Sequence, residues 1–383
     1  MAPELALDAL STTNHPIKVL DPMSGSGTAL HHASVLGHEA HGLDMDPLSV
    51  LMAKVWTTPI RIAEIEGAYQ ETIKVALAVD PDSLRLPWID DDVETKKFVE
   101  FWFGAKQRKE LRCLAAVLTN PTEFLPETVT ENSVDVLKIA MSRIIITKGQ
   151  CASLARDTSH SRPHKVVEES DYGVFTGFKA SVNQVARRLS GLSLKGYVNV
   201  ALGDARKLDF DDDQFDLILT SPPYLNAIDY MRGHKLGLVW LGYSISELRV
   251  IRSSSIGTEK APENGDKGAD TVQRAFGDIS NLPFRYKAMI ERYALDLTKS
   301  VAEAARVLKK NGRATYVVGN SCLKGVFIRN SSAVSAAARI AGLRVIDEVE
   351  RDLPQNRRYL PINTTSGLAQ RMRTETVLTF KKD

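Results

Sequence analysis

The sequence predicts an α/β protein with a doubly wound sheet and one large, mostly helical insert. Two observations indicate this fold. A short apolar run near the N-terminus leads into a glycine-containing turn and then into helical periodicity, the order of elements in a doubly wound sheet. The same alternation returns after residue 195, and the segment between the two halves shows helical periodicity with proline breaks, for example at Pro81, Pro87 and Pro121.

The individual elements follow from periodicity and from turn residues. In the first half we expect a strand at 17–22, a turn at 23–28, a helix at 29–36, a second strand ending in the run 42–47, and a helix at 48–56. In the second half we expect strands at 197–202, 215–220, 313–319 and 343–348, helices at 283–308 and 332–341, and a closing edge strand at 373–380.

Domain boundaries follow from where the strand–helix pattern stops. Residues 1–59 and 196–383 are expected to form one domain, with residues 60–195 as the helical insert. A shorter insert at about 225–282 includes the polar stretch 257–270, which we expect to be a loop.

Composition places the chain among ordinary globular proteins and excludes several classes. Of the 383 residues 43% are hydrophobic and 25% charged, and the formal net charge of +2 is too small to indicate a nucleic-acid partner without local basic clusters. The three cysteines form no disulfide or zinc pattern and favour a cytoplasmic protein, and the histidines form no metal-ligand pattern. We expect neither a signal peptide nor a membrane-spanning helix.

The most informative motif is Ser221-Pro222-Pro223-Tyr224, which follows an apolar run. Proline lacks an N–H, so the backbone there offers carbonyl acceptors, the serine adds a hydroxyl, and the tyrosine offers a stacking face. Such a set suits a planar base that carries an exocyclic amine. The alternative is that the two prolines only end a strand.

The glycine turn near the N-terminus predicts a nucleotide-type ligand. Gly25 and Gly27 follow a strand, but Leu30 stands where a dinucleotide site requires its third glycine. Asp21 at the strand end would repel a pyrophosphate and attract an ammonium group, and Asp44 is placed to accept from ribose hydroxyls. An adenosine that carries an amino acid fits these features, so the predicted cofactor is S-adenosylmethionine. Asp204 is expected to accept from the adenine amine; a turn or cap role is the alternative.

Together the two motifs resemble those of amino-group DNA methyltransferases. The run 21–28 is similar to the family's cofactor motif, and Ser-Pro-Pro-Tyr to its catalytic motif in the N4-cytosine form. The resemblance covers about 17–58 and 197–250 plus the closing strands, and it implies a Rossmann-like methyltransferase sheet with S-adenosylmethionine as cofactor. It departs from the family in Met23, where an aromatic residue is usual, in the order of the motifs, and in the 16 residues before the first strand, which leave little room for a covering helix.

The resemblance also assigns roles to residues of this chain. The implied cofactor-binding residues are Asp21, Met23, Gly25, Gly27, Thr28, Asp44, Met45, Asp204 and Ala205; the implied catalytic residues are Ser221, Pro222, Pro223 and Tyr224. Ser221 and the Pro222 carbonyl would accept hydrogen bonds from a cytosine N4 amine, and Tyr224 would stack on the base after it leaves the duplex. The chain contains no Pro-Cys pair, which argues against methylation at C5.

Three clusters are the candidate DNA contacts. Basic side chains are interleaved with histidines and serines in 141–165, and a second group follows the tetrapeptide closely. The nucleic-acid-binding candidates are Arg156, Arg162, Lys165, Tyr230, Arg232 and Lys235, and Arg357, Arg358 and Tyr359 form a third basic–aromatic cluster. The insert 60–195 is expected to recognise the target. A solvated loop is the alternative for the first cluster.

The predicted function is transfer of a methyl group to N4 of a flipped-out cytosine in double-stranded DNA. Three alternatives remain open on the sequence. They are an adenine-N6 DNA methyltransferase, an RNA methyltransferase, and a nucleic-acid-binding protein that keeps the fold without turnover.

Overall fold

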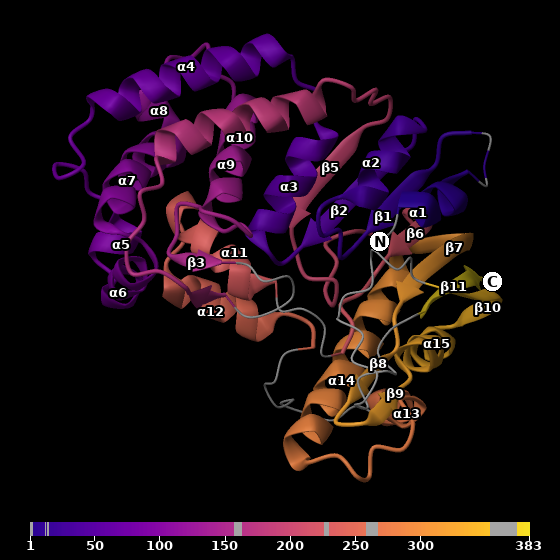
Figure 1. Cartoon of the computed structure of the whole chain (residues 1–383). Helices are drawn as coiled ribbons and strands as arrows, with labels where there is room; N and C mark the ends of the chain where they lie inside the picture. Colours follow the sequence, from indigo (N-terminus) through magenta and orange to yellow (C-terminus); the bar gives the residue numbers. More distant parts are fainter. Residues whose placement is uncertain are drawn as a thin grey trace. The chain divides into compact units, whose positions relative to one another are not determined.

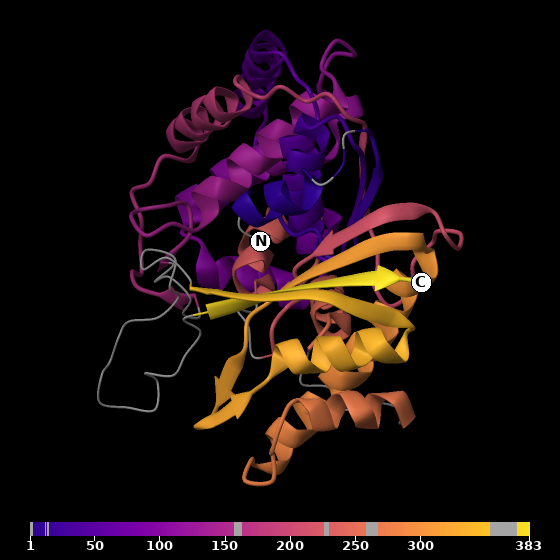
Figure 2. The ribbon, with the colours of Figure 1, turned by 90° about the vertical axis from the view of Figure 1, so that its right-hand side faces the viewer.

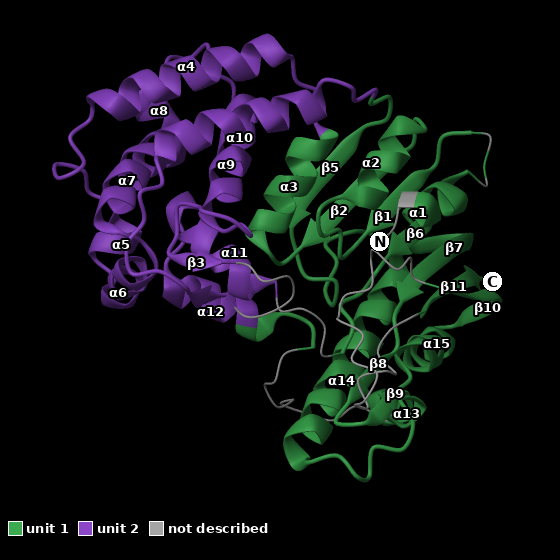
Figure 3. Cartoon of the chain, viewed as in Figure 1, with its two compact units in different colours: residues 1–57, 194–228, 253–383 green, residues 58–193, 229–252 purple. Residues whose placement is uncertain are grey.

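The structure is a computed structural model that describes residues 3–11, 13, 15–156, 163–225, 230–257, 267–352 and 374–383. Contacts divide the chain into two compact units (Figure 3). Unit 1 comprises residues 1–57, 194–228 and 253–383, and unit 2 comprises residues 58–193 and 229–252. Residues 230–252, a few positions after the Ser-Pro-Pro-Tyr motif, therefore group with the helical insert rather than with the sheet.

Unit 1 contains a seven-stranded sheet with the order β10-β11-β7-β6-β1-β2-β5 (Figure 1). Its strands are β1 (Lys18–Asp21), β2 (Glu39–Asp44), β5 (Val198–Leu202), β6 (Phe215–Thr220), β7 (Leu308–Val318), β10 (Leu343–Asp352) and β11 (Thr374–Lys382). The pairs β5·β2, β2·β1, β1·β6 and β6·β7 are parallel, and β11 is antiparallel to both of its neighbours. This confirms the predicted doubly wound, Rossmann-like sheet.

The strand order reverses direction between β1 and β6. From β1 the chain proceeds through β2 to β5 on one side, and from β6 through β7 on the other. In doubly wound sheets ligands bind outside the carboxyl ends of the strands at such a switch point. Both sequence motifs lie there, because the glycine turn follows β1 and the Ser-Pro-Pro-Tyr motif follows β6.

Alternating side chains of the central strands feed two separate cores, because successive residues of a strand point to opposite faces. Val19 packs with α1 (Pro3–Leu10), α2 (Thr28–Val35) and α3 (Pro47–Thr57). Its neighbour Leu20 packs in a second cluster with α13 (Lys267–Ala275), α14 (Phe284–Val307) and α15 (Asn330–Ile340). Helices therefore cover both faces of the sheet, as a doubly wound fold requires.

Three expectations from the sequence are corrected in unit 1. The residues before β1 do contain a helix, α1, because Ala6 and Leu10 are fully buried against α2. The closing strand β11 is not at an edge: it lies between β7 and β10 (Figure 2), and Leu378 and Phe380 are fully buried. In the polar stretch expected to be a loop, residues 267–270 belong to α13; residues 258–266 lie outside the described part.

The other predicted elements of unit 1 lie where they were expected, with small shifts at their ends. The largest shift is in β7, which begins at Leu308 rather than 313 because residues 309–312 form a bulge with Asn311 at φ 64°. The hairpin of β8 (Ser321–Leu323) and β9 (Val326–Ile328) follows β7.

Unit 2 is mostly helical. Its helices are α4 (Ile62–Ala78), α5 (Pro87–Asp90), α6 (Val93–Trp102), α7 (Ala105–Thr119), α8 (Pro121–Phe124), α9 (Glu131–Ile145), α10 (Val174–Leu189), α11 (Met231–Leu238) and α12 (Ile245–Ser254), with the 3₁₀ turn η1 (Val239–Leu241). The last two residues of α12 belong to unit 1. A two-stranded hairpin joins β3 (Ala155–Arg156) to β4 (His164–Lys165). Across the described residues, no helix combines the length and the apolar character that spanning a bilayer would need.

Candidate active site

The glycine turn after β1 requires its glycines for two different reasons. Gly25 and Gly27 have φ of 50° and 82°, in the left-handed region that side chains disfavour. At Gly27 a Cβ would also lie 2.8 Å from the Cβ of Ala53 on α3, so helix packing excludes any side chain there. At Gly25 no atom lies within 4 Å of a Cβ position, so this backbone is open to a ligand.

Asp44, at the end of β2, holds the glycine turn by its carboxylate. One oxygen accepts from the backbone N–H of Gly25 at 2.9 Å, and the other accepts from Asp46 N at 2.9 Å. Beside it, the hydroxyl of Ser24 is buried and has no hydrogen-bond partner within the described structure. The turn thus contains one buried hydroxyl, that of Ser24, with spare hydrogen-bonding capacity.

Asp21 joins the two motifs directly. Its Oδ1 accepts from the Thr220 hydroxyl at 2.7 Å and from the backbone N–H of Met23 at 3.2 Å. Thr220 ends β6 and immediately precedes Ser221. The carboxylate of Asp21, the first residue of the cofactor motif, is therefore bonded directly to the start of the catalytic motif. Asp21 is only 3% exposed, and this burial raises its pKa to about 6 despite the two hydrogen bonds. A cation beside it would favour its ionised form.

The Ser-Pro-Pro-Tyr turn is anchored from two elements. The Ser221 hydroxyl donates to the carbonyl of Val317 on β7 at 3.0 Å, which fixes its proton and leaves its lone pairs to accept. The hydroxyl of Tyr293, a fully buried residue of α14, donates to the Pro223 carbonyl at 2.7 Å. Tyr224 is half-buried, packs against the core beneath α14, and has its hydroxyl 3.5 Å from that of Ser221.

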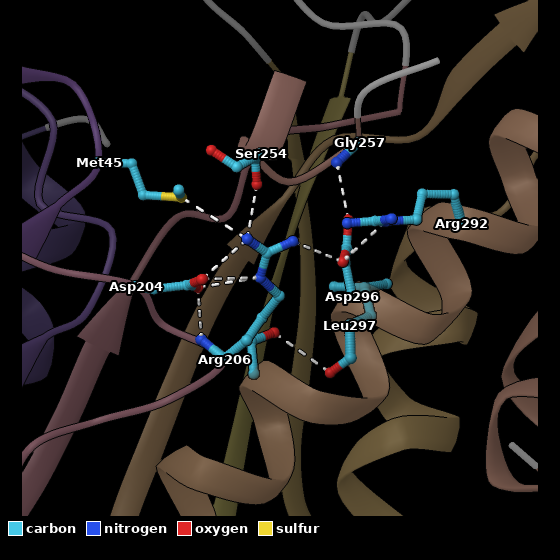
Figure 4. A network of polar contacts seen from close by, with 9 residues as sticks. Met45, Asp204, Arg206, Ser254, Gly257, Arg292, Asp296 and Leu297 are labelled. Carbon is cyan, nitrogen blue, oxygen red and sulfur yellow. Dashed lines mark hydrogen bonds and ion pairs between the residues drawn. The ribbon is translucent and has the colours of Figure 1, made fainter. Parts of the chain in front are cut away.

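The turn after β5 contains Asp204 in a network of charged groups (Figure 4). Both oxygens of Asp204 accept from Arg206, whose guanidinium also donates to Asp296 of α14 and lies 3.8 Å from the Met45 sulfur. Burial alone would raise the pKa of Asp204, but the bonds from Arg206 hold it below its usual value. Asp204 is thus an ionised, rigidly oriented acceptor. The adjacent Ala205 is buried.

Of the remaining cofactor candidates, Met23 and Thr28 are half-buried at the two ends of the glycine turn, and Thr28 begins α2. The structure therefore brings the ends of β1, β2, β5 and β6 to one edge of unit 1, with the predicted residues of each.

Several nucleic-acid candidates meet on α6 in unit 2. The ammonium of Lys165 lies 5.4 Å from the ring of Phe101, and that of Lys235 lies 5.2 Å from the ring of Phe98. Lys165 also pairs with Glu168. The two lysines are distant in sequence, yet they contact aromatic rings three residues apart on one helix.

The other candidates lie in different environments. Arg156 folds onto its own loop, donating to the Ala155 carbonyl at 2.8 Å, whereas Tyr230 is 59% exposed and its ring lies beside that of His234. Arg232 lies on α11 and is half-buried. Arg162, and with it the cluster Arg357, Arg358 and Tyr359, lies outside the described residues.

Sequence reasoning did not find four residues of this edge: Arg206, Tyr293, Asp296 and Val317. The last three belong to elements whose pattern indicates only a buried helix or strand. Of the four, only Arg206 could have been suspected from the sequence, because it is a cation two residues after Asp204, the predicted acceptor for the adenine amine. Its partners on α14 depend on how that helix packs, which no local pattern encodes.

The strand order, with polar turns at its switch point, is that of a Rossmann-like doubly wound fold. No known family profile matches the chain. The Type II methyltransferase M.MvaI of Kocuria varians is 23% identical over 413 aligned positions, which cover 100% of this chain and 88% of the relative. M.BsoBI of Geobacillus stearothermophilus, also a Type II methyltransferase, is 23% identical over 62% of this chain and 50% of its own length. The similarity to these two Type II methyltransferases confirms the predicted resemblance.

Among solved structures, an S-adenosylmethionine-dependent methyltransferase from Methanosarcina mazei aligns over 100% of this chain and 98% of its own. The identity is 8% and the TM-score 0.36.

Proposed function

We propose that this protein is a DNA methyltransferase that moves a methyl group from S-adenosylmethionine to the exocyclic N4 amine of a flipped-out cytosine. The hydrogen bond between Asp21 and Thr220 carries the proposal, because it joins the cofactor motif to the catalytic motif at the switch point of the sheet. The two Type II methyltransferases that align with the chain support the same reaction class.

The glycine turn fits the proposed cofactor in shape and in charge. The open backbone at Gly25 admits close approach, and the buried Ser24 hydroxyl lacks a partner within the described structure. Asp21 would hold the ammonium of the methionine moiety, Asp44 the ribose hydroxyls and Asp204 the adenine amine. When bound there, S-adenosylmethionine supplies an electrophilic methyl group on a sulfonium.

The catalytic turn would activate the target amine by accepting its hydrogen bonds. A cytosine N4 lone pair is delocalised into the ring and is a weak nucleophile. The Ser221 hydroxyl donates its own proton to the Val317 carbonyl, so its oxygen accepts a hydrogen bond from one N–H of the amine. The Pro222 carbonyl accepts a hydrogen bond from the other N–H. These two bonds draw the nitrogen toward tetrahedral geometry and localise its lone pair. The remaining requirement is alignment at about 3–3.5 Å from the methyl group, for which Tyr224 holds the base by stacking.

Serine in the first position of the motif supports cytosine over adenine as the target base, following the family resemblance. Unit 2 is the proposed target-recognition region, with Arg156, Lys165, Tyr230, Arg232 and Lys235 as contacts to DNA. Lys165 and Lys235 combine a positive charge with an adjacent aromatic ring, which suits a strand of phosphates and splayed bases.

Incubation with tritiated S-adenosylmethionine and either duplex DNA or RNA, followed by nucleoside mass spectrometry, tests the proposal. We expect N4-methylcytosine from DNA. N6-methyladenine as the sole product would overturn the choice of base, and label in RNA alone would overturn the choice of substrate. Cofactor binding without transfer to any nucleic acid would identify a non-catalytic protein.

A further inference from the structure

We propose that α14 is the positioning helix of the active site, and that two residues three apart on it hold the two halves separately. Tyr293 holds the catalytic turn after β6, and Asp296, through Arg206, holds the adenine-side turn after β5. This inference rests on the proposed function. It assigns both residues roles in positioning rather than in contact with substrate.

Tyr293 fixes the direction of the peptide units that would present the catalytic carbonyl. Its side chain is fully buried, and the 2.7 Å bond to the Pro223 carbonyl commits that oxygen to α14. Burial raises the pKa of Tyr293 far above its usual value, so the phenol remains a donor at all relevant pH values. Because both prolines have restricted φ, anchoring the second carbonyl also limits the rotation available to the preceding Pro222 carbonyl.

Asp296 acts on the other turn through a guanidinium. Its Oδ1 accepts from Arg206 at 2.8 Å, and Arg206 in turn contacts both oxygens of Asp204 and the sulfur of Met45 (Figure 4). Arg206 and Asp296 have side chains only 12% and 2% exposed. A buried charge that loses its partner is strongly unfavourable, so the pair locks Arg206 in a single orientation.

The same network extends beyond the turn itself. Arg206 donates to the Ser254 carbonyl, and Asp296 accepts from Arg292 one helical turn earlier and from the backbone N–H of Gly257 at 3.3 Å. The network therefore contains two carboxylates, of Asp204 and Asp296, and two guanidiniums, of Arg206 and Arg292, whose charges balance. Of these groups, Asp204 lies at the proposed cofactor site. The core beneath α14 is apolar, so the helix also has contacts to the sheet that do not involve this polar network.

The inference is tested by comparing kcat with cofactor affinity in two sets of variants. Tyr293→Phe forms the first set, and Asp296→Asn and Arg206→Lys form the second. Tyr293→Phe removes one hydrogen bond at constant shape. We expect its kcat on duplex DNA to fall about tenfold or more while the Kd for S-adenosylhomocysteine changes less than about twofold. For Asp296→Asn and Arg206→Lys we expect the Kd for S-adenosylhomocysteine and the KM for S-adenosylmethionine to rise about tenfold. Their kcat at saturating S-adenosylmethionine should remain nearly unchanged.

Arg112→Lys is the matched control, because Arg112 makes a comparable bidentate pair with Asp90 plus a bond to the Leu84 carbonyl, inside unit 2. Thermal unfolding of all four variants measures stability in parallel. We expect Arg112→Lys to lower the melting temperature without changing the Kd for S-adenosylhomocysteine.

Three outcomes separate the possible failures. If the wild-type protein binds no S-adenosylhomocysteine, the proposed function itself fails. If the wild type is active and Tyr293→Phe, Asp296→Asn and Arg206→Lys all change kcat and KM in the same proportion, the separation of the site into two halves is wrong. If their kinetic losses merely follow their melting temperatures as in Arg112→Lys, the network is structural and the inference is overturned.

Discussion

Replacing Asp21 with asparagine should make the ligand-free protein more stable while weakening cofactor binding. Both hydrogen bonds to Asp21 arrive at the same oxygen, Oδ1, from Thr220 and from Met23 N. An asparagine keeps that oxygen as an acceptor and replaces the other by a neutral amide nitrogen. The substitution therefore removes the buried negative charge and leaves the geometry of the two motifs in place.

The magnitude follows from the pKa of Asp21, which burial raises from 3.8 to about 6. A carboxyl whose pKa is raised on folding stabilises the protein fully below pH 3.8, and that stability is lost as the pH rises through about 6. Since one pKa unit corresponds to about 1.4 kcal/mol, the ionised form costs about 3 kcal/mol above pH 7. Asp21→Asn should recover up to that amount at pH 8 and almost none at pH 4.

Urea unfolding of both proteins without cofactor, at pH 4 and pH 8, measures this difference. Calorimetry with S-adenosylmethionine at pH 8 should show binding weakened at least about tenfold, because the ammonium group loses its counter-charge. Calorimetry of the wild-type protein at lower pH should show its affinity for S-adenosylmethionine falling below about pH 6, where Asp21 becomes protonated. An equal stability change at both pH values would refute the argument, since it would show that Asp21 carries no buried charge in the folded protein.

Three further predictions concern the catalytic turn, the glycine turn and the DNA-binding candidates. Tyr224→Ala should leave the Kd for S-adenosylmethionine nearly unchanged and lower methyl transfer about tenfold or more, because base stacking contributes about 1–3 kcal/mol; unchanged turnover would show that the ring is not used. Gly27→Ala should lower the melting temperature more than Gly37→Ala, since both have positive φ but only the Cβ at Gly27 meets Ala53; equal shifts would contradict the clash. The double substitution Lys165→Ala and Lys235→Ala should weaken duplex binding in mobility-shift titrations and reduce its salt dependence, without changing S-adenosylmethionine affinity; an unaltered salt slope would exclude these lysines from phosphate contact.

The sequence determined the sheet and the chemical character of its carboxyl edge. Apolar runs of four to six residues followed by glycine, proline or aspartate identify strands and their turns, because those residue types restrict the backbone locally. Gly25 and Gly27 are such cases, with φ values that only glycine adopts readily. The pairing of the two motifs was sufficient to predict the methyltransferase relationship that the relatives confirm.

Local patterns could not determine the order of strands or the contacts between distant elements. β11 reads as an edge strand by its polar alternation, and only the pairing with β7 and β10 reveals that it is internal. The same limit applies to the 2.7 Å contact between Asp21 and Thr220, which are 199 residues apart. Tyr293 and Asp296 read as ordinary positions of a buried helix, and their partners follow only from how α14 packs. Backbone preferences act between neighbours, whereas packing depends on the whole fold, so the sequence specified the reacting groups and the tertiary structure specified what holds them.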